Sequence, residues 1–137
     1  MHLERFGSTE AVRHAKSELA KALPPGGLLV CNADSPNALR IAQESTHCRV
    51  LLYGERHEGP LQTRLESVQF TRQGTRFVLR TPDRSYHCFT PVLGRPIVLN
   101  LTGAFTLACA LGVDPDIAVA AMTTLKPDRK STRLNSS

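Results

Sequence analysis

Lys16 is the residue whose position most calls for a chemical explanation. It lies in a predicted helix, about 40° from Val12 around the axis, and it is the one charge on the apolar face. An ammonium that faces a core is costly unless it is paired or reaches water. Lys16 is therefore either a lysine whose stem packs on apolar surface while its head reaches solvent, or a lysine with a chemical task. The apolar face spans about 80° and consists of Val12, Ala15, Leu19 and Leu23.

His2 is the second candidate, because the short segment "LERFGS" is able to fold it back toward this helix. An ammonium has no free lone pair and repels a divalent cation. A lysine amine that has reacted with carbon dioxide is a carbamate, whose two hard oxygens suit Mg²⁺. Composition alone leaves the ordinary alternatives standing, in which His2 is an exposed residue near a chain end and Lys16 reaches solvent.

The helices and strands expected around these residues indicate an α/β fold. A helix is expected from the capping residues Ser8 or Thr9 to about Leu23, where "PPGG" ends it. Two short apolar runs, "LLVCN" (28–32) and "RVLLY" (49–53), predict buried strands on either side of a short helix over about 36–44. This order predicts a parallel sheet with helical crossovers.

The pattern changes after residue 65. Alternation of apolar and polar residues with turns at Gln73-Gly74 and Pro82-Asp83 predicts a three-stranded antiparallel meander. Residues 98–111 predict a mostly buried helix, and Asp114 followed by Pro115 predicts the start of another. The expected fold class is a partial parallel sheet with crossover helices plus this meander.

Composition bounds the function only weakly. The chain has 137 residues, no membrane-length apolar run, and four cysteines without a CxxC pair, which favours free thiols. Its net charge of +5 includes the last ten residues, "DRKSTRLNSS", which resemble a translated sequencing adapter; without them 14 basic and 11 acidic residues leave +3. Aromatic residues make up 5% and the basic residues do not cluster, so a nucleic-acid partner is not expected.

"HLERFGSTEAVRHAKSEL" followed by "LPPGGLLVCNAD" resembles the Mur ligases, and "QGTRFVLRTPDRSYHCFTPVLGR" is similar to the meander of their central domain. "ALGVDPDIAVAAMTTLKP" is similar to the helix that leads out of that domain. The resemblance covers His2 to about Pro127. It implies that residues 1–127 are the C-terminal part of a Mur ligase central domain and that residues 128–137 are a non-native tail.

The resemblance also implies roles for residues. In this family the histidine matching His2 is a Mg²⁺ ligand, the lysine matching Lys16 carries a carbamate that helps hold magnesium near ATP, and the asparagine matching Asn100 lies by the adenine. The implied cofactors are ATP and Mg²⁺, and the implied location is the cytoplasm. The reaction passes through an acyl phosphate. The "HLE…FGS" form favours the member that joins D-alanyl-D-alanine to a UDP-linked muramoyl peptide over sibling Mur and folylpolyglutamate-type ligases.

Two features depart from a complete enzyme of this kind. "GRPIVLN" has Pro96 and Ile97 where the family pattern has a histidine and an asparagine, which puts nucleotide binding by this segment in question. The chain contains no phosphate-cradling G-x-x-x-x-G-K-[ST] motif. We therefore expect the chain to be inactive alone and its sheet to have an open edge that causes self-association. A stand-alone basic domain that binds phosphate is the alternative from a different class.

"NAD" at residues 32–34 follows the first predicted strand, and ligands bind at such strand ends in α/β sheets. Capping of the next helix is the favoured role for Asp34, and ligand binding is the alternative.

Overall fold

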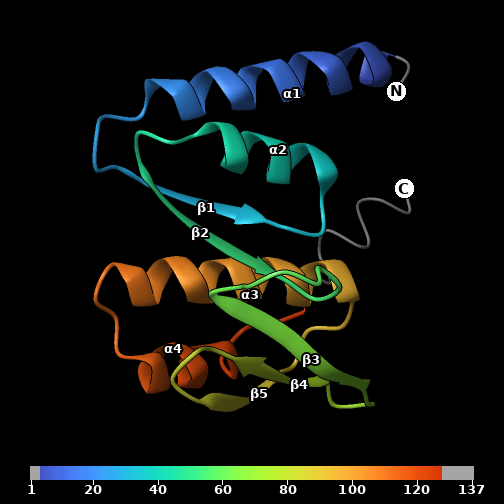
Figure 1. Ribbon diagram of the computed structural model, residues 1–137. Coiled ribbons are helices and arrows are strands. Elements are labelled where there is room, and N and C mark those ends of the chain that lie inside the picture. The colour runs from blue at the N-terminus through green and yellow to red at the C-terminus, as the bar shows by residue number, and fades with distance from the viewer. Residues whose placement is uncertain (1–3, 128–137) are drawn as a thin grey trace.

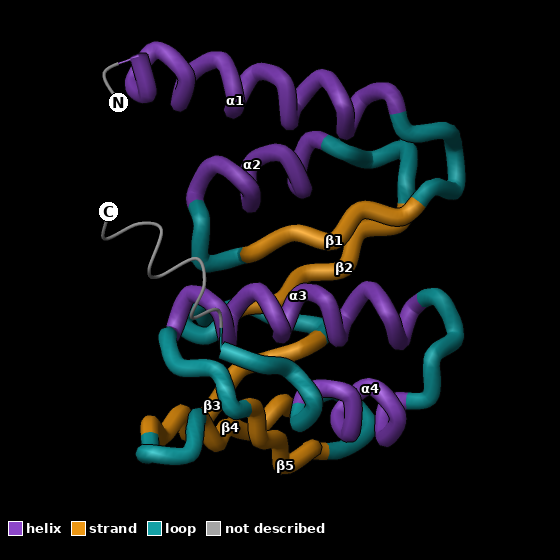
Figure 2. The backbone as a smooth tube through the Cα atoms, turned by 180° about the vertical axis from the view of Figure 1, so that it is seen from behind, coloured by secondary structure: helices purple, strands orange, loops and turns teal. Residues whose placement is uncertain are grey.

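The structure is a computed structural model that describes residues 4–127 of the chain. Over this range the chain forms one five-stranded sheet in the order β1-β2-β3-β4-β5, with helices around it (Figures 1 and 2). The elements are α1 (Glu4–Ala22), β1 (Leu28–Asn32), α2 (Pro36–Glu44), β2 (Arg49–Gly54), β3 (Thr63–Phe70), β4 (Thr75–Arg80), β5 (Ser85–Thr90), α3 (Arg95–Ala110) and α4 (Pro115–Met122).

The first part of the sheet is parallel, as the helix–strand order predicts. β1 pairs with β2 from Leu28↔Arg49 to Asn32↔Tyr53, and α2 makes the crossover between them. In both views these two strands lie between α2 and α3 (Figures 1 and 2). Apolar helices on both faces explain why the two strands read as continuous apolar runs.

The predicted meander is confirmed. β3, β4 and β5 pair antiparallel, and a bulge between Glu66 and Gln69 interrupts the first ladder. The sequence did not predict that β3 also pairs with β2, in parallel and over only two residue pairs, Tyr53↔Thr63 and Gly54↔Arg64. The connection between these two strands is a loop and contains no helix. This loop becomes part of the candidate site.

Both predicted helices are present, but α3 is less buried than predicted, because only five of its 16 residues are buried. α3 begins at Arg95 instead of residue 98, because Pro96 occupies the first turn, where its missing N–H costs nothing. α4 begins as predicted, with the Asp114 side chain accepting a 2.9 Å hydrogen bond from the backbone N–H of Asp116. α3 is tied to the sheet by a buried hydrogen bond of 2.8 Å from Thr106 Oγ1 to Thr63 Oγ1.

The hydrophobic core lies between the meander and the last two helices. β4 and β5 each contribute two alternate residues and β3 contributes one, and the rings of Tyr86 and Phe105 pack 5.4 Å apart. Burial of this many large side chains is the main stabilising contribution to the fold. The cluster consists of Leu65, Phe77, Leu79, Tyr86, Cys88, Val98, Phe105 and Met122.

The prediction for α1 is wrong in two respects. The helix starts at Glu4, so Ser8 and Thr9 lie within it and do not cap it. Its apolar face does not pack on the core, since Val12 is 49% and Leu19 70% exposed. α1 instead lies over α2 (Figure 1) and contacts it next to this face, where Arg13 Nη1 donates to Asn37 Oδ1 at 3.3 Å. The apolar face is uncovered because β1 is the edge strand of the described sheet.

All four cysteines are free, as their spacing predicts. Cys31 and Cys88 are buried, and burial raises the pKa of the Cys88 thiol to about 12. A thiol with so high a pKa is almost entirely protonated at neutral pH and is a poor nucleophile. The structure assigns these cysteines to packing.

Candidate functional site

Lys16 faces a groove between α1 and the edge of the sheet. The groove has a volume of about 780 Å³, and its walls come from α1, β1, α2 and the end of β2. Lys16 shares it with the apolar residues Val12, Leu19 and Leu23, so the predicted common face is real, although it meets an open groove where a core was expected. Lys16 is exposed, whereas Arg13, one turn before it on α1, is half-buried.

Of the predicted magnesium pair, His2 and Lys16, the structure describes only Lys16. His2 lies outside the described residues, so its position relative to Lys16 stays a prediction. Among the side chains that the structure describes, those of residues 11–127, no group of three or more His, Cys, Asp and Glu is close enough to hold a metal ion. A magnesium site at Lys16 thus requires ligands other than those the described range brings together. The polar groups that line the groove beside it are Arg13, Asn32, Ser35, Asn37 and Tyr53.

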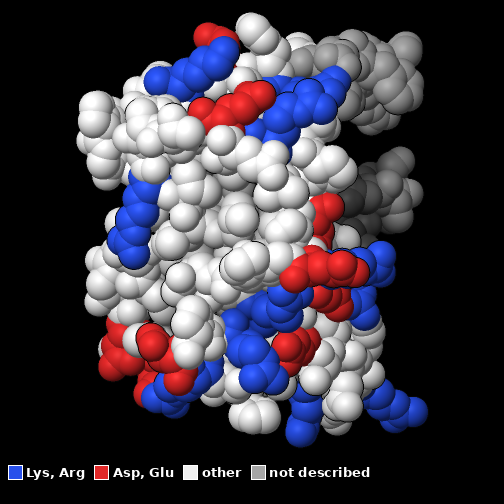
Figure 3. All heavy atoms as spheres, viewed as in Figure 1, with Lys and Arg blue, Asp and Glu red and all other residues white. Residues whose placement is uncertain are grey.

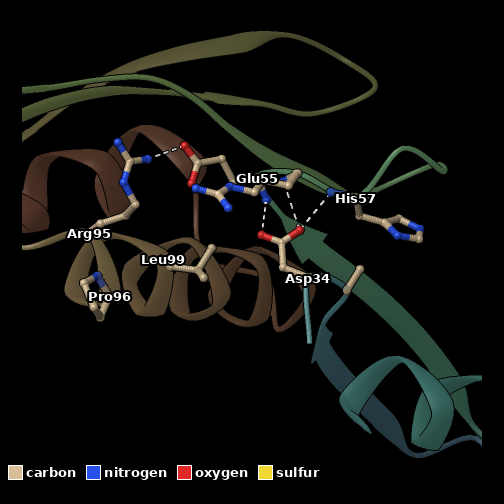
Figure 4. Close-up of a pocket in the computed structure, with 8 residues that line it drawn as sticks. Asp34, Glu55, His57, Arg95, Pro96 and Leu99 are labelled. Atoms are coloured by element: carbon tan, nitrogen blue, oxygen red, sulfur yellow. Dashed lines mark hydrogen bonds and ion pairs between the residues drawn. The ribbon is translucent and has the colours of Figure 1, made fainter. Parts of the chain in front are cut away.

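A second pocket of about 570 Å³ lies where β1 and β2 end and α3 begins. One wall comes from α3, with the apolar side chains of Pro96 and Leu99, and the opposite wall from the loop after β2 (Figure 4). The carboxyl ends of adjacent parallel strands are where α/β sheets bind ligands. The full lining is Ala33, Asp34, Glu55, Arg56, His57, Arg95, Pro96 and Leu99.

Asp34 does not cap α2, contrary to the favoured prediction. Ser35 is the N-cap, and its hydroxyl accepts a 3.3 Å hydrogen bond from the Ala38 N–H. The Asp34 carboxylate instead accepts three backbone N–H groups of the loop after β2, from Glu55 at 2.8 Å, Arg56 at 2.9 Å and His57 at 2.8 Å. A short acidic side chain at a strand end accepts hydrogen bonds from nearby free N–H groups. Here the loop after the neighbouring strand supplies these N–H groups.

These hydrogen bonds alter the acidity of Asp34. Partial burial raises the pKa of its carboxyl group, but the three N–H donors and the nearby His57 outweigh burial and leave the pKa below its ordinary value. The approach also requires Gly54, because a Cβ there would lie 2.8 Å from Asp34 Oδ1. The carboxylate is thus fully engaged with the backbone of the loop.

Arg64 holds the same loop from the opposite side. Its guanidinium donates to the carbonyl oxygens of Glu55 (3.3 Å), His57 (2.7 Å) and Gly59 (3.0 Å). Guanidinium groups carry several donors in a fixed planar arrangement, which suits them to several carbonyls at once. The loop therefore has its N–H groups held by an anion and its carbonyls held by a cation.

Glu55 and Arg95 face each other across the mouth of the pocket and form an ion pair (Figure 4). The imidazole of His57 points away from the Asp34 carboxylate in the same view. The sequence analysis missed Glu55, Arg64 and Arg95. A charged residue directly after an apolar strand was the only signal for Glu55, and nothing local identified the partners of the two arginines.

Asn100 lies on α3 but does not line this pocket. It is exposed and comes one turn after Pro96, whereas Pro96 and Leu99 form the wall. Ile97 is 40% exposed and also lies outside the lining. Of the predicted site residues, the structure thus brings neither Lys16 nor Asn100 into the pocket, and the two candidate regions are separate.

The fold and the pocket define a class: an α/β domain with a pocket at the ends of its parallel strands. Residues 1–108 match the model of the Mur ligase middle domain. The chain belongs to the Mur ligase family.

The relatives include several kinds of Mur ligase. The chain is 37% identical to the UDP-N-acetylmuramate–L-alanine ligase of Mycolicibacterium vanbaalenii, over 82% of this chain and 24% of that protein. It is 30% identical to the UDP-N-acetylmuramoyl-tripeptide–D-alanyl-D-alanine ligase of Escherichia coli, over 91% of this chain and 27% of that protein. The solved structure of MurF from Acinetobacter baumannii matches with a TM-score of 0.76 at 25% identity, over 92% of this chain and 27% of that one.

The chain therefore spans about a quarter of the length of these relatives. These relatives add different amino acids or peptides, so similarity does not separate the D-alanyl-D-alanine type from its siblings. Within residues 4–127 no helix is both long and apolar enough to cross a membrane.

Proposed function

We propose that this chain is part of the central domain of an ATP-dependent Mur ligase that joins D-alanyl-D-alanine to a UDP-linked muramoyl peptide in the cytoplasm. In the proposed reaction ATP phosphorylates the substrate carboxylate, and the amine of D-alanyl-D-alanine attacks the resulting acyl phosphate. The family match over residues 1–108 is the observation that carries the proposal. The choice of D-alanyl-D-alanine rests on the "HLE…FGS" form of the N-terminal segment.

The pocket at the ends of β1 and β2 supports a place for the nucleotide base. Pro96 and Leu99 offer an apolar surface for a flat ring, and the Glu55–Arg95 pair offers both a hydrogen-bond acceptor and donors to its polar edge. Asn100, one turn further along α3, is proposed to contact the adenine from the helix surface, since an amide is both donor and acceptor.

The groove supports a place for magnesium next to Lys16. As a carbamate, Lys16 would supply two oxygens, and His2 a nitrogen, to a Mg²⁺ ion that neutralises charge on the phosphates. The exposure of Lys16 in an open groove suits this role, because carbon dioxide and the ion both need access. A lysine held in a sealed core would have neither.

We further propose that the chain needs additional polypeptide to be active. The β1 edge carries unpaired backbone groups beside an apolar groove, and the relatives are about four times as long. A further strand of a longer protein, paired to β1, would cover both. Residues 128–137 are proposed to be foreign to that protein.

The test compares the 137-residue chain with the complete reading frame that contains it. We expect no detectable ATP turnover from the chain, and Mg²⁺-dependent phosphate release with D-alanyl-D-alanine from the complete protein. Robust turnover by the chain alone would overturn the need for more polypeptide. Preference for L-alanine as the amine would overturn the proposed substrate.

Lys16→Arg in the complete protein tests the magnesium role. Arginine keeps the positive charge but does not form a carbamate, so we expect a loss of at least about a hundredfold in kcat, a size typical of losing one group that stabilises charge in the transition state. Lys21→Arg is the matched control, because Lys21 lies on the same helix and pairs with Glu18 at the surface. Equal activity of the two variants would remove Lys16 from the mechanism.

A further inference from the structure

The loop after β2 is held unusually firmly for a loop at a pocket. Asp34 accepts three of its N–H groups, and Arg64 donates to three of its carbonyls. Asp34 lies in the turn after β1 and Arg64 lies on β3, and the two side chains bind opposite polar edges of one short segment. Side chains that bind only one or two loop groups would leave the segment free to rotate about those contacts.

This loop delivers Glu55 to the pocket. The Glu55 N–H is bound by Asp34 and its carbonyl oxygen by Arg64, so both peptide groups that flank its Cα are fixed. Its carboxylate then meets Arg95, in the first turn of α3. The Arg95 guanidinium also lies 5.8 Å from the centre of the Phe70 ring, which limits where it is able to move.

We propose that Asp34 is a positioning residue for this pocket: through the backbone of residues 55–57 it fixes the Glu55 carboxylate against Arg95. The meaning of this for nucleotide binding rests on the function proposed above. Pro96 and Ile97 replace two polar residues of the family pattern in the first turn of α3, and the Glu55–Arg95 pair supplies polar groups at the same end of that helix.

A merely structural role for Asp34 predicts something different. In that case Asp34→Asn lowers the stability of the chain but leaves the interaction between Glu55 and Arg95 unchanged. A positioning role predicts that the interaction itself weakens. The coupling between the two residues therefore separates the two roles, whereas stability alone does not.

The coupling is measured in the 137-residue chain by a double-mutant cycle. Urea unfolding is followed at micromolar concentration for Glu55→Gln, Arg95→Gln and the double variant, and the cycle cancels the separate loss of the Arg95–Phe70 contact. We expect a coupling of about 1.5- to 5-fold in the unfolding constant, the range of partly exposed ion pairs. In the Asp34→Asn background we expect the coupling to vanish.

Asp116→Asn is the matched background. Asp116 pairs with Arg84 on the exposed side of α4, remote from this loop, so the coupling should stay at its original size. Arg64→Lys provides a second route to the same loop, because lysine does not reach three carbonyls at once, and it replaces Asp34→Asn if that variant does not unfold cooperatively. An unchanged coupling in the Asp34→Asn or Arg64→Lys background would overturn the proposal.

A separate titration with Mg²⁺-ATP distinguishes the two proposals. Perturbation of the resonances of Leu99 and Asn100 by the nucleotide supports the base site, and its absence in the complete protein counts against the proposed function. Neither result affects the cycle, which involves no ligand. The positioning role of Asp34 therefore stands or falls on the coupling alone.

Discussion

The parallel part and the meander part of the sheet bury their side chains to different extents. The core cluster belongs entirely to β3, β4, β5, α3 and α4, and it includes large side chains such as Phe77 and Phe105. The buried apolar residues that precede β2 are few and mostly small: Ala20, Cys31, Ala33, Ile41 and Ala42. The parallel strands are thus arranged as in a buried sheet, but the described residues cover them only in part.

The surface reflects the same difference. Figure 3 shows charged side chains gathered over the meander and along α1, while much of the surface between them is uncharged. The uncharged region corresponds to the level of α2, β1 and β2 in Figure 1. The groove beside α1 is lined mostly by apolar residues, and open apolar surface marks a place where another part of a protein docks. The difference teaches that a closed core and an open groove arise from one sheet according to which strand is at its edge.

Phe77→Ala should have the largest effect on this comparison. Phe77 is 2% exposed at the centre of the meander core, and removing such a ring costs about 3–5 kcal/mol of unfolding free energy. Leu19→Ala is the paired change in the parallel part, where the side chain is 70% exposed and we expect a change below about 0.5 kcal/mol. Urea unfolding measures both, and equal costs would contradict the division into a closed and an open part.

Gly103→Ala tests the seam between the two parts. A Cβ at this position of α3 would lie 2.6 Å from the ring of Tyr53 on β2, and the rigid ring has to shift. We expect a loss of about 1–2 kcal/mol, because overpacking outweighs the gain in helix propensity. Tyr53→Leu in the same chain should restore most of this loss. A neutral or stabilising Gly103→Ala, measured by thermal unfolding, would show that the seam is loose.

Leu19→Glu tests whether the open groove causes self-association. A carboxylate in the groove opposes apolar contact between two copies, and we expect about tenfold weaker association in sedimentation velocity, equal to the loss of one buried leucine. Ile117→Glu, on α4, is the control, since this side chain is 63% exposed but lies outside the groove. A monomeric wild-type chain, or equal effects of both variants, would show that the groove does not cause self-association.

Lowering the pH should protonate Asp34 and so weaken its hydrogen bonds to the loop. We expect this effect on stability to be the smallest of the four predicted here. The folded pKa of Asp34 lies below its ordinary value of 3.8, so its contribution is complete above about pH 4 and is lost as the pH falls through the folded pKa. We expect the stability of the wild-type chain to fall below pH 4 more than that of Asp34→Asn. Parallel pH profiles of the two proteins, from urea unfolding between pH 2 and 6, would contradict the hydrogen bonds seen at this carboxylate.

Much of the fold could be predicted because its signals are local. "LLVCN" and "PNALRIAQE" have the bounds in the structure that the apolar runs and caps predict, and the meander turns fall at Gly74 and Pro82 as expected. The start of α1 was predicted incorrectly, because a capping residue such as Ser8 is also tolerated inside a helix. The prediction that its apolar face is buried was wrong. Amphipathic spacing identifies an apolar helix face but does not tell whether another element covers that face.

The candidate site divides in the same way. Lys16 was singled out by spacing alone, because a charge among apolar positions is visible in one helix, and the structure places it in a groove while its magnesium role stays a prediction. Asp34 was found as a residue at a strand end, but its role was misjudged, because its three partners lie more than 20 residues away. The pairing of Glu55 with Arg95 spans 40 residues and has no local signature.

The sequence by itself determined the order of helices and strands, the parallel start, the antiparallel meander and the family, because apolar period, caps, turns and short motifs act over a few residues. Only the tertiary structure decided which strand lies at the edge, that the apolar face of α1 lines an open groove, and that Asp34 and Arg64 close on one loop. These depend on contacts between residues distant in the chain, whose energies local sequence patterns do not encode.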